Sequence, residues 1–459
     1  MRVLLVYGGH PRIDDTGSEE HLGLAYLAAV LREDGHQVTI LDGAVTRASS
    51  RELFRGIWER RNQFDLLGFS CPFTDSLEPV GRLATVLRDR GLQQHFTVGG
   101  HPPTFLAREM LERWPAYDSV VVGEGEETFR ELVEALDSGL DWTTLAGLAH
   151  ARSGQATVNP RRPLIADLDQ LPFPARDTLA QHAQREAPLS ASVLKSRGCY
   201  GQCSFCDTVA FYRSSPGAPW RSRSPADVAE EIEELARDRG VTHIRFWDDN
   251  FIGPGRKGRR LAEELATQIL DRRLEIDYAL ECRVDNVDPE LFQLLKESGL
   301  KRVFLGIESG VQRALDTFNK GVTVEQNTRA LETLRELDLD VRVGFILLDP
   351  YTTLEELLEN LDWLRDNVGP TSHIRRILTQ PLNILEVYEG APIMQRLRED
   401  GLLRGSFTGY AYRFADRRVD VLVQVLLALR KMGFTLKDAA TRARRAVRAG
   451  GEAGPQARR

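Results

Sequence analysis

Short apolar runs typical of strands alternate with helical patterns along most of the chain, and this alternation restricts the fold more than any other feature. In the first 150 residues the expected strands are Arg2–Tyr7, Gln37–Leu41, Leu66–Ser70, Phe96–Val98 and Ser119–Val122. The expected helices between them lie near Glu19–Glu33, Arg51–Arg61, Leu77–Arg90 and Glu126–Leu136. This pattern predicts an α/β fold with a doubly wound, Rossmann-like parallel sheet.

A second series of strand and helix patterns starts after residue 190. Its expected strands are Ser192–Ser196, Thr242–Trp247, Ile276–Cys282, Arg302–Ile307, Val341–Leu347 and His373–Leu378. Its expected helices are Pro225–Asp238, Lys257–Asp271, Asp288–Glu297, Val324–Leu337 and Leu354–Arg365. These units are too few to close an eight-stranded barrel, so a partial (β/α)6 TIM barrel is expected.

The two series divide the 459 residues into four regions. A Rossmann-like domain is expected at residues 1–145 and the partial barrel at residues 189–384. Residues 146–188 are expected to connect them, with a hairpin at Leu148–Val158 and then a Pro-rich irregular stretch. Residues 385–459 are expected to form a small helical C-terminal region with a basic tail.

Composition and charge exclude several classes of protein. The hydrophobic fraction of 42% is enough for globular cores, but no apolar run reaches the ~18 residues of a membrane span. A net charge of −7 argues against a nucleic-acid-binding protein. The amino terminus has no signal-peptide pattern, and five cysteines without disulfide-type spacing indicate a reducing compartment. The sequence therefore predicts a cytoplasmic protein without membrane or nucleic-acid partners.

Three of the five cysteines, Cys199, Cys203 and Cys206, form a C-x3-C-x2-C motif. Thiolates spaced so closely favour zinc or iron–sulfur chemistry. A structural zinc site needs a fourth ligand, and no His or Cys follows at zinc-finger spacing. Three thiolates on a [4Fe–4S] cluster would instead leave one iron open for a small molecule. A zinc knuckle remains the alternative.

With Phe205 before its last cysteine, the motif resembles the signature of radical SAM enzymes. The resemblance implies that Cys199, Cys203 and Cys206 hold a [4Fe–4S] cluster whose open iron binds S-adenosylmethionine. It also implies reductive cleavage of that cofactor to a 5′-deoxyadenosyl radical, which takes a hydrogen atom from a small-molecule substrate. A flavodoxin or ferredoxin is the electron donor expected for the family. No cysteine follows Cys282, which argues against an auxiliary cluster of the SPASM type.

Acidic residues recur where the expected barrel strands end, which is the edge at which such barrels gather their chemistry. Several carboxylates at one mouth would suit the ammonium, sulfonium and ribose hydroxyls of S-adenosylmethionine. The residues that match cofactor-binding positions of the family are Phe205, Asp248, Asp249, Glu281, Arg283 and Glu308.

The resemblance also implies roles for these positions. Phe205 would pack against the adenine, and Asp248 and Asp249 would hold the methionyl amine. Glu281, Arg283 and Glu308 would bind the ribose or the carboxylate. Asp249, Glu281 and Glu308 are also candidate catalytic residues, because a carboxylate can act as a general base. The alternative for each acid is a helix N-cap or a surface charge.

Residues 1–150 resemble the cobalamin-binding domain that precedes many radical SAM cores, and Leu22–Glu33 looks like its first helix. Glycines follow the first, fourth and fifth expected strands, where such sheets bind ligands, although tight turns would also explain them. The cobalt-ligating motif D-x-H-x-x-G begins at Asp34 and His36, but Thr39 replaces its glycine. Histidine ligation of cobalt is therefore not expected, and cobalamin binding itself stays open.

Two reactions fit these features. The organisation resembles the radical SAM diol dehydratase of apramycin-type aminoglycoside biosynthesis, which implies radical dehydration of an amino sugar or aminoglycoside precursor. The alternative is a cobalamin-dependent radical SAM methyltransferase of antibiotic biosynthesis. The acidic mouth and the incomplete cobalt-ligating motif favour dehydration. A regulatory sensor is a third class, but neither a DNA-reading helix nor a basic patch in the sequence supports it.

Overall fold

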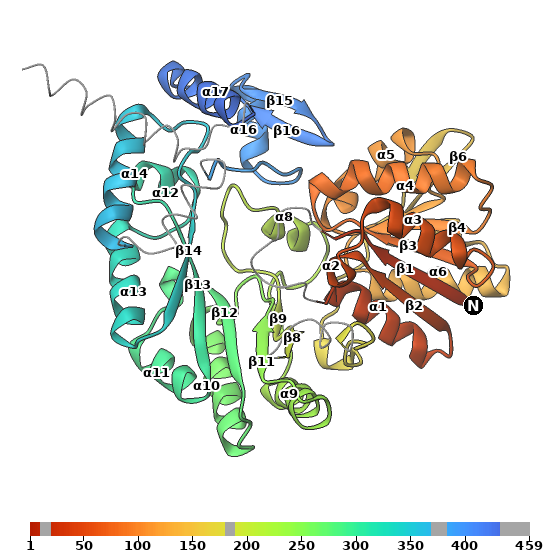
Figure 1. Cartoon of the computed structure of the whole chain (residues 1–459), viewed down its shortest axis with the longest axis horizontal. Helices are drawn as coiled ribbons and strands as arrows, with labels where there is room; N and C mark the ends of the chain where they lie inside the picture. Colours follow the sequence, from red (N-terminus) through yellow and green to blue (C-terminus); the bar gives the residue numbers. More distant parts are fainter. Residues whose placement is uncertain (10–19, 180–188, 369–382, 432–459) are drawn as a thin grey trace, which may run out of the picture.

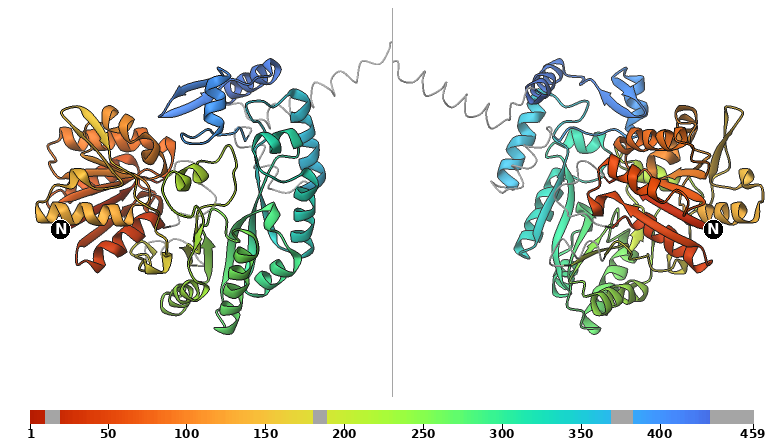
Figure 2. Two further views of the ribbon diagram at one scale, coloured as in Figure 1. Left: turned by 180° about the vertical axis from the view of Figure 1, so that it is seen from behind. Right: turned by 45° about the vertical axis from the view of Figure 1, so that its right-hand side comes forward.

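The computed structural model describes residues 1–9, 20–179, 189–368 and 383–431. Figure 1 shows two α/β bodies side by side, an N-terminal domain in red to yellow and a partial barrel in green to teal. A C-terminal region in blue reaches from the barrel toward the N-terminal domain, as the two further views in Figure 2 also show. Within the described ranges, no helix has the length and apolar character needed to cross a membrane.

The N-terminal domain is built on a seven-stranded sheet with strand order β2-β1-β3-β4-β5-β6-β7. Its strands are β1 (Arg2–Tyr7), β2 (Gln37–Asp42), β3 (Leu66–Ser70), β4 (His95–Gly99), β5 (Ser119–Val121), β6 (Leu148–Arg152) and β7 (Gln155–Val158). The first five strands are parallel, whereas β6 and β7 are antiparallel. The predicted doubly wound sheet is confirmed, and its parallel part has the 2-1-3-4-5 order of flavodoxin-like folds.

Helices cover both faces of this sheet, because its central strands are apolar on both sides. They are α1 (Leu22–Glu33), α2 (Gly43–Thr46), α3 (Ser50–Glu59), α4 (Leu77–Asp89), α5 (His101–Arg113) and α6 (Glu126–Ser138). Side chains of α1 and α6 pack into one buried cluster, and those of α3, α4 and α5 pack into another.

Two features of this domain differ from the predicted pattern. Helix α5 is absent from that pattern, because the residues after Gly100 read as a turn. Pro102 and Pro103 instead occupy the first turn of the helix, where no backbone N–H is needed. The hairpin β6–β7, predicted within the connector, extends the sheet at its β5 edge. The hairpin therefore belongs to the N-terminal sheet, although the sequence places it in the connector.

The second body is a parallel sheet with strand order β14-β13-β12-β11-β8. Its strands are β8 (Ser190–Val193), β11 (His243–Phe246), β12 (Asp277–Arg283), β13 (Leu300–Glu308) and β14 (Asp340–Phe345). Its main helices are α9 (Pro225–Arg239), α10 (Gly255–Asp271), α11 (Pro289–Glu297), α13 (Val324–Glu336) and α14 (Leu354–Asn367). Five units of the predicted (β/α)6 barrel are confirmed. The sixth strand, expected at His373–Leu378, lies outside the described residues.

The first barrel strand ends earlier than predicted. After β8 the chain forms a short antiparallel ladder between β9 (Ser196–Arg197) and β10 (Arg221–Ser222). The cysteine loop and helix α8 (Asp207–Arg213) lie between these two strands in the chain. The ladder therefore joins both ends of the segment that carries the three cysteines.

The C-terminal region contacts both bodies. This region is expected to be helical, and it contains the helices α16 (Ile393–Glu399) and α17 (Arg417–Lys431). A hairpin of β15 (Leu403–Ser406) and β16 (Gly409–Tyr412), which is not expected, lies between them in the chain. Phe407, between β15 and β16, packs edge-on against Trp114 at the end of α5, with ring centroids 5.9 Å apart. The Ile393 backbone N–H donates to the Ser204 carbonyl in the cysteine loop at 2.8 Å. The expected basic tail lies outside the described residues.

Candidate active site

The cysteine loop lies between the barrel and the N-terminal domain (Figure 1). All three thiols are free, with Cys203 buried and Cys199 and Cys206 partly exposed. Among the described residues, no three His, Cys, Asp or Glu side chains converge closely enough to hold a single metal ion. A zinc site needs that convergence, whereas a cubane cluster takes each thiolate on a different iron. Three thiolates on one loop suit a [4Fe–4S] cluster, in which each would bind a separate iron and the fourth iron would stay open.

Residues at the end of α12 (Gln312–Thr317) hold the outer part of the cysteine loop. Ser204 donates through its backbone N–H to the Phe318 carbonyl and through its hydroxyl to the Thr317 carbonyl, both at 2.7 Å. Phe205 packs edge-on against Phe318, with ring centroids 5.2 Å apart. Phe205 thus anchors the loop against α12 and the residue that follows it, and its contact with adenine stays a prediction.

Two cations lie beside Cys203. Arg283 Nη1 is 3.5 Å from the Cys203 sulfur, and its Nη2 donates to the Lys320 carbonyl at 2.6 Å. Lys320 is itself buried. Burial raises the pKa of the Cys203 thiol, and the charges of Lys320 and Arg283 offset part of that rise. These cations therefore stabilise the thiolate form that a metal cluster requires.

Asp248 faces inward and supports the strand that leads to the cysteines. Its Oδ2 accepts the backbone N–H of Lys195 at 3.1 Å, and its Oδ1 accepts the Ser196 hydroxyl at 2.5 Å. The residue is 1% exposed, and burial raises the pKa of Asp248 to about 6 against the opposing charge of Lys195. A contact between Asp248 and the methionyl amine would have to compete with these hydrogen bonds.

The raised pKa of Asp248 predicts a pH dependence of stability. The native carboxyl keeps its proton up to about pH 6, whereas the unfolded chain releases it near 3.8. The protonated Asp248 carboxyl therefore adds roughly 3 kcal/mol to the free energy of unfolding at a pH below the unfolded-state pKa. This stabilisation is lost as the pH rises through the folded-state pKa. Asp248→Asn lacks the titrating group. Urea unfolding of both proteins between about pH 4 and 7 should show wild type losing stability relative to the variant. A difference in the free energy of unfolding between the two proteins that stayed constant over this pH range would contradict the raised pKa of Asp248.

Asp249 is exposed at the barrel mouth. Its Oδ2 accepts the backbone N–H of Gly198 at 3.0 Å, and its Oδ1 accepts the Thr208 hydroxyl at 3.2 Å. Gly198 has a φ of 83°, and an added Cβ would lie 1.9 Å from the Pro219 carbonyl oxygen, so glycine is required before Cys199. Asp249 therefore supports the loop and also presents charge to the mouth.

Glu281 and Arg283 lie on one face of β12, because side chains two residues apart in a strand share a face. The Glu281 carboxylate is 3.9 Å from Arg245 Nη2. Cys282, between them, is buried in the hydrophobic core, which agrees with the packing role predicted for it.

Glu308 ends β13 with a φ of 65°, next to a register shift that starts at Gly306. Positive φ is uncommon outside glycine, and bulges often redirect a side chain near active sites. The Glu308 carboxylate pairs with Lys320 Nζ at 2.7 Å. The structure thus brings the predicted residues Arg283 and Glu308 together beside Cys203. It does so through Lys320, a loop residue that no sequence motif marks.

The carboxyl edge of the N-terminal sheet has the geometry of a ligand-binding crevice, because the strand order reverses between β1 and β3. His36 lies at the opposite edge, where the N-terminal ammonium contacts its Nδ1 at 2.9 Å. His21 lies at the crevice, but its Nδ1 accepts the Leu24 N–H at 3.1 Å and its Nε2 contacts the Ser70 hydroxyl at 2.8 Å. The edge therefore has the topology of a ligand site, and neither His36 nor His21 is placed to ligate cobalt there.

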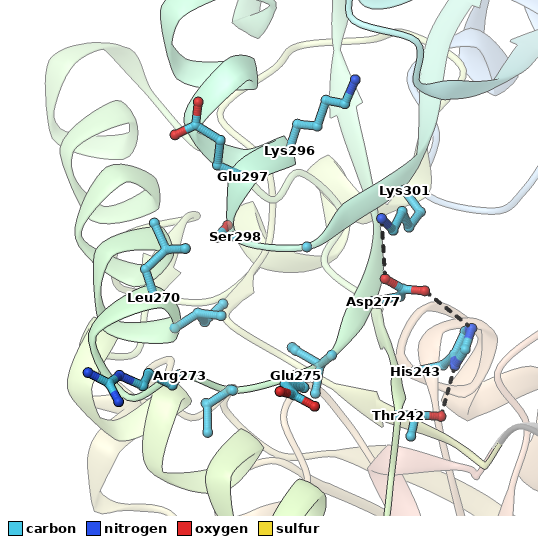
Figure 3. Close-up of a pocket in the computed structure, with 14 residues that line it drawn as sticks. Thr242, His243, Leu270, Arg273, Glu275, Asp277, Lys296, Glu297, Ser298 and Lys301 are labelled. Carbon is cyan, nitrogen blue, oxygen red and sulfur yellow. Dashed lines mark hydrogen bonds and ion pairs between the residues drawn. The ribbon is translucent and has the colours of Figure 1, made fainter.

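A cavity of about 490 Å³ lies at the other end of the barrel strands (Figure 3). His243, Asp277 and Lys301 line it near the starts of β11, β12 and β13. The Asp277 carboxylate is 3.8 Å from His243 Nε2 and 3.6 Å from Lys301 Nζ. Because parallel barrels gather their chemistry at the carboxyl ends of the strands, this cavity is not the candidate active site.

Known proteins match this chain in both bodies. Residues 193–364 match the model of the Radical SAM superfamily, and residues 9–133 match the B12 binding domain. An uncharacterized methyltransferase of Pyrococcus horikoshii is 31% identical over 337 residues, which cover 73% of this chain and 71% of that protein. An anaerobic magnesium-protoporphyrin IX monomethyl ester cyclase of Rubrivivax gelatinosus is 29% identical over 382 residues, which cover 80% of this chain and 66% of the cyclase.

A solved structure shares the fold. The cobalamin-dependent S-adenosylmethionine radical enzyme OxsB, with aqua-cobalamin and S-adenosylmethionine bound, matches with a TM-score of 0.75 and 22% identity. The match covers 93% of this chain and 66% of OxsB. A radical SAM domain implies a [4Fe–4S] cluster and S-adenosylmethionine as cofactors, with cobalamin a candidate third. The chain belongs to the radical SAM superfamily and carries a B12 binding domain ahead of its radical SAM domain.

Proposed function

We propose that the chain is a cobalamin-dependent radical SAM methyltransferase that acts on a small polar natural-product substrate. The observation that carries the proposal is the close approach of the B12-type sheet to the cysteine loop. His101, which follows β4 at the carboxyl edge of that sheet, stacks on Phe211 of α8 with ring centroids 4.1 Å apart. Ligands of both folds bind at the carboxyl ends of the strands, so a methyl carrier and a radical source would face one space.

The relatives favour methyl transfer over the dehydration that the sequence features favoured. The Pyrococcus relative is named a methyltransferase and the Rubrivivax relative a cyclase, whereas neither is named a dehydratase. The aminoglycoside precursor expected from the sequence therefore has no support from these names. The cyclase name makes ring closure a further outcome that an assay must separate from methylation.

The residues at the barrel mouth would have separate tasks in this reaction. Cys199, Cys203 and Cys206 would hold the cluster. Asp249, at the exposed mouth, would bind the methionyl ammonium, and Glu281, on the inner face of β12, would take a proton from the substrate. When bound, the cluster and S-adenosylmethionine supply a 5′-deoxyadenosyl radical and cobalamin supplies a methyl group. A flavodoxin or ferredoxin would deliver the electron.

Isotope labelling tests the proposal directly. Protein produced with ample cobalamin should retain corrinoid through purification, as its absorption spectrum would show. With dithionite and S-adenosylmethionine that carries a trideuterated methyl group, it should label a small molecule in a cell extract, detected by mass spectrometry. Protein produced without cobalamin is the control, and it should form 5′-deoxyadenosine but no labelled product. A product lighter by one water, or any product formed equally without corrinoid, would contradict methyl transfer.

A further inference from the structure

An acidic loop of the N-terminal domain binds the strand that leads into the cysteines. This loop runs from β5 to α6: Glu124 lies within it, and Glu126, at its end, is the first residue of α6. Arg197 is the last residue of β9, just ahead of Cys199. Arg197 Nη2 pairs with Glu126 Oε1 at 2.6 Å, and its Nη1 pairs with Glu124 Oε1 at 3.1 Å. These three side chains are at most 10% exposed. One guanidinium therefore bridges two buried carboxylates across the domain interface.

Glu124 also binds the other strand of the ladder. Its carboxylate accepts two hydrogen bonds from Arg221 Nη1, at 2.8 and 3.0 Å, and one from the Ile165 backbone N–H at 2.8 Å. Arg221 is the partner of Arg197 in the β9–β10 ladder. Although burial raises the pKa of Glu124, the charges of Arg197 and Arg221 outweigh it and lower that pKa, so the carboxylate stays ionised. The acidic loop thus binds both ends of the cysteine segment.

The neighbours of Arg197 are bound from the barrel side. The Ser196 hydroxyl donates to Asp248, and the Gly198 backbone N–H donates to Asp249, both just after β11. Three consecutive residues before Cys199 are therefore bound alternately by the barrel, the N-terminal domain and the barrel. The position of the first cluster ligand depends on both domains.

We propose that Glu124 and Glu126 are positioning residues for the iron–sulfur cluster. By binding Arg197, the acidic loop of the B12-type domain determines where Cys199 lies relative to the carboxyl edge of its own sheet. Displacement of one cluster ligand alters how the open iron meets S-adenosylmethionine, and small misplacements of reacting groups cost large factors in rate. The inference concerns cleavage of S-adenosylmethionine and is independent of methyl transfer.

A second buried ion cluster supplies a matched control. Arg176 pairs with Glu20 of the N-terminal domain at 2.7 Å and with Glu231 of α9 at 2.5 Å, and these side chains are at most 4% exposed. This cluster also joins the two domains: Glu20 accepts hydrogen bonds from Arg176 and from the Thr178 hydroxyl. Glu231 also pairs with Arg223, one residue beyond β10, so the cluster reaches the chain next to the ladder but binds neither Arg197 nor Arg221 in the contacts above. If Glu126 serves only the stability of the domain interface, losing Glu126 and losing Glu20 should affect stability and S-adenosylmethionine cleavage alike. If Glu126 positions the cluster, only its loss should also slow that cleavage.

The test compares Glu126→Gln, Arg197→Lys and Glu20→Gln in the full-length, reconstituted protein. Each change disrupts a buried ion pair, so each should lower the unfolding temperature. Glu126→Gln and Arg197→Lys should also slow 5′-deoxyadenosine formation on the order of 10- to 100-fold with unchanged iron content. They should alter the electron paramagnetic resonance spectrum of the reduced cluster with S-adenosylmethionine. Glu20→Gln should keep the wild-type rate and spectrum at a temperature at which it is folded.

Arg197→Lys separates positioning from the loss of a buried charge. Lysine keeps the cation but lacks the fork that reaches two carboxylates, so the variant should fold even if Glu126→Gln does not. The proposal is overturned if Arg197→Lys matches Glu20→Gln in rate and spectrum. These measurements need neither substrate nor corrinoid. A protein that transfers no methyl group could therefore still confirm the positioning role, and a confirmed methyltransferase could still contradict it.

Discussion

Cys203→Ala is expected to reduce 5′-deoxyadenosine formation to background. Cys203 is the buried member of the triplet, and its sulfur lies beside the Arg283 guanidinium. Alanine removes one of the three thiolates. The two cysteines that are left cannot hold the cluster, because its fourth iron already depends on a small molecule as ligand. Iron and sulfide content, the absorption of the oxidised cluster and chromatography of 5′-deoxyadenosine after dithionite reduction measure the loss.

Cys71→Ala is the matched control for this loss. Cys71 is also a buried, free thiol, but it follows β3 in the N-terminal domain, where its Sγ lies 3.9 Å from the Ser76 carbonyl. Both substitutions remove a buried sulfur and leave a small cavity, so they should destabilise the fold by similar amounts, about 1 kcal/mol or more. If Cys71→Ala lost the cluster equally, the effect would reflect folding. If Cys203→Ala kept it, the loop would not be the cluster site.

Local sequence pattern predicts the elements of both sheets, because the apolar residues in the pattern are the ones that each strand or helix buries. Strands β1 and β3 have the predicted bounds because almost every side chain in them is apolar and buried. Helix α5 escapes prediction because its first turn contains two prolines after a glycine pair, a composition that also fits a loop. The cysteine spacing identifies the candidate site, because three ligands close together in sequence need no knowledge of the fold.

Contacts between distant segments set the rest of the site and cannot be read from local pattern. Lys320 pairs with Glu308 at the end of β13, next to a register shift that local sequence does not mark. Arg197 and Glu126 are 71 residues apart in the chain and meet through docking of one domain on the other. Asp248 and Asp249 are equivalent in sequence, yet one faces the interior and the other the mouth, because adjacent residues point in different directions.

Asp249→Asn is expected to weaken binding of S-adenosylmethionine by roughly 10- to 100-fold while cluster content stays unchanged, because a hydrogen bond to a charged group contributes ~1.5–3 kcal/mol. Asparagine keeps an oxygen that can accept the Gly198 N–H, so the loop retains this support. The substitution removes the charge that would face the methionyl ammonium. The expected signature is a raised KM for S-adenosylmethionine in 5′-deoxyadenosine formation with little change in kcat.

Asp248→Asn is the control one residue away, and the pair of variants assigns the amine site. Asp248 is buried and bound to Lys195 and Ser196, so its amide variant should alter stability and leave the affinity for S-adenosylmethionine near the wild-type value. A raised KM in Asp248→Asn but not in Asp249→Asn would place the ammonium on the inner carboxylate. Unchanged affinity in both variants would mean that the two acids serve the loop alone. The amine would then bind another acid of the mouth, with Glu281 the next to test because Glu308 already pairs with Lys320.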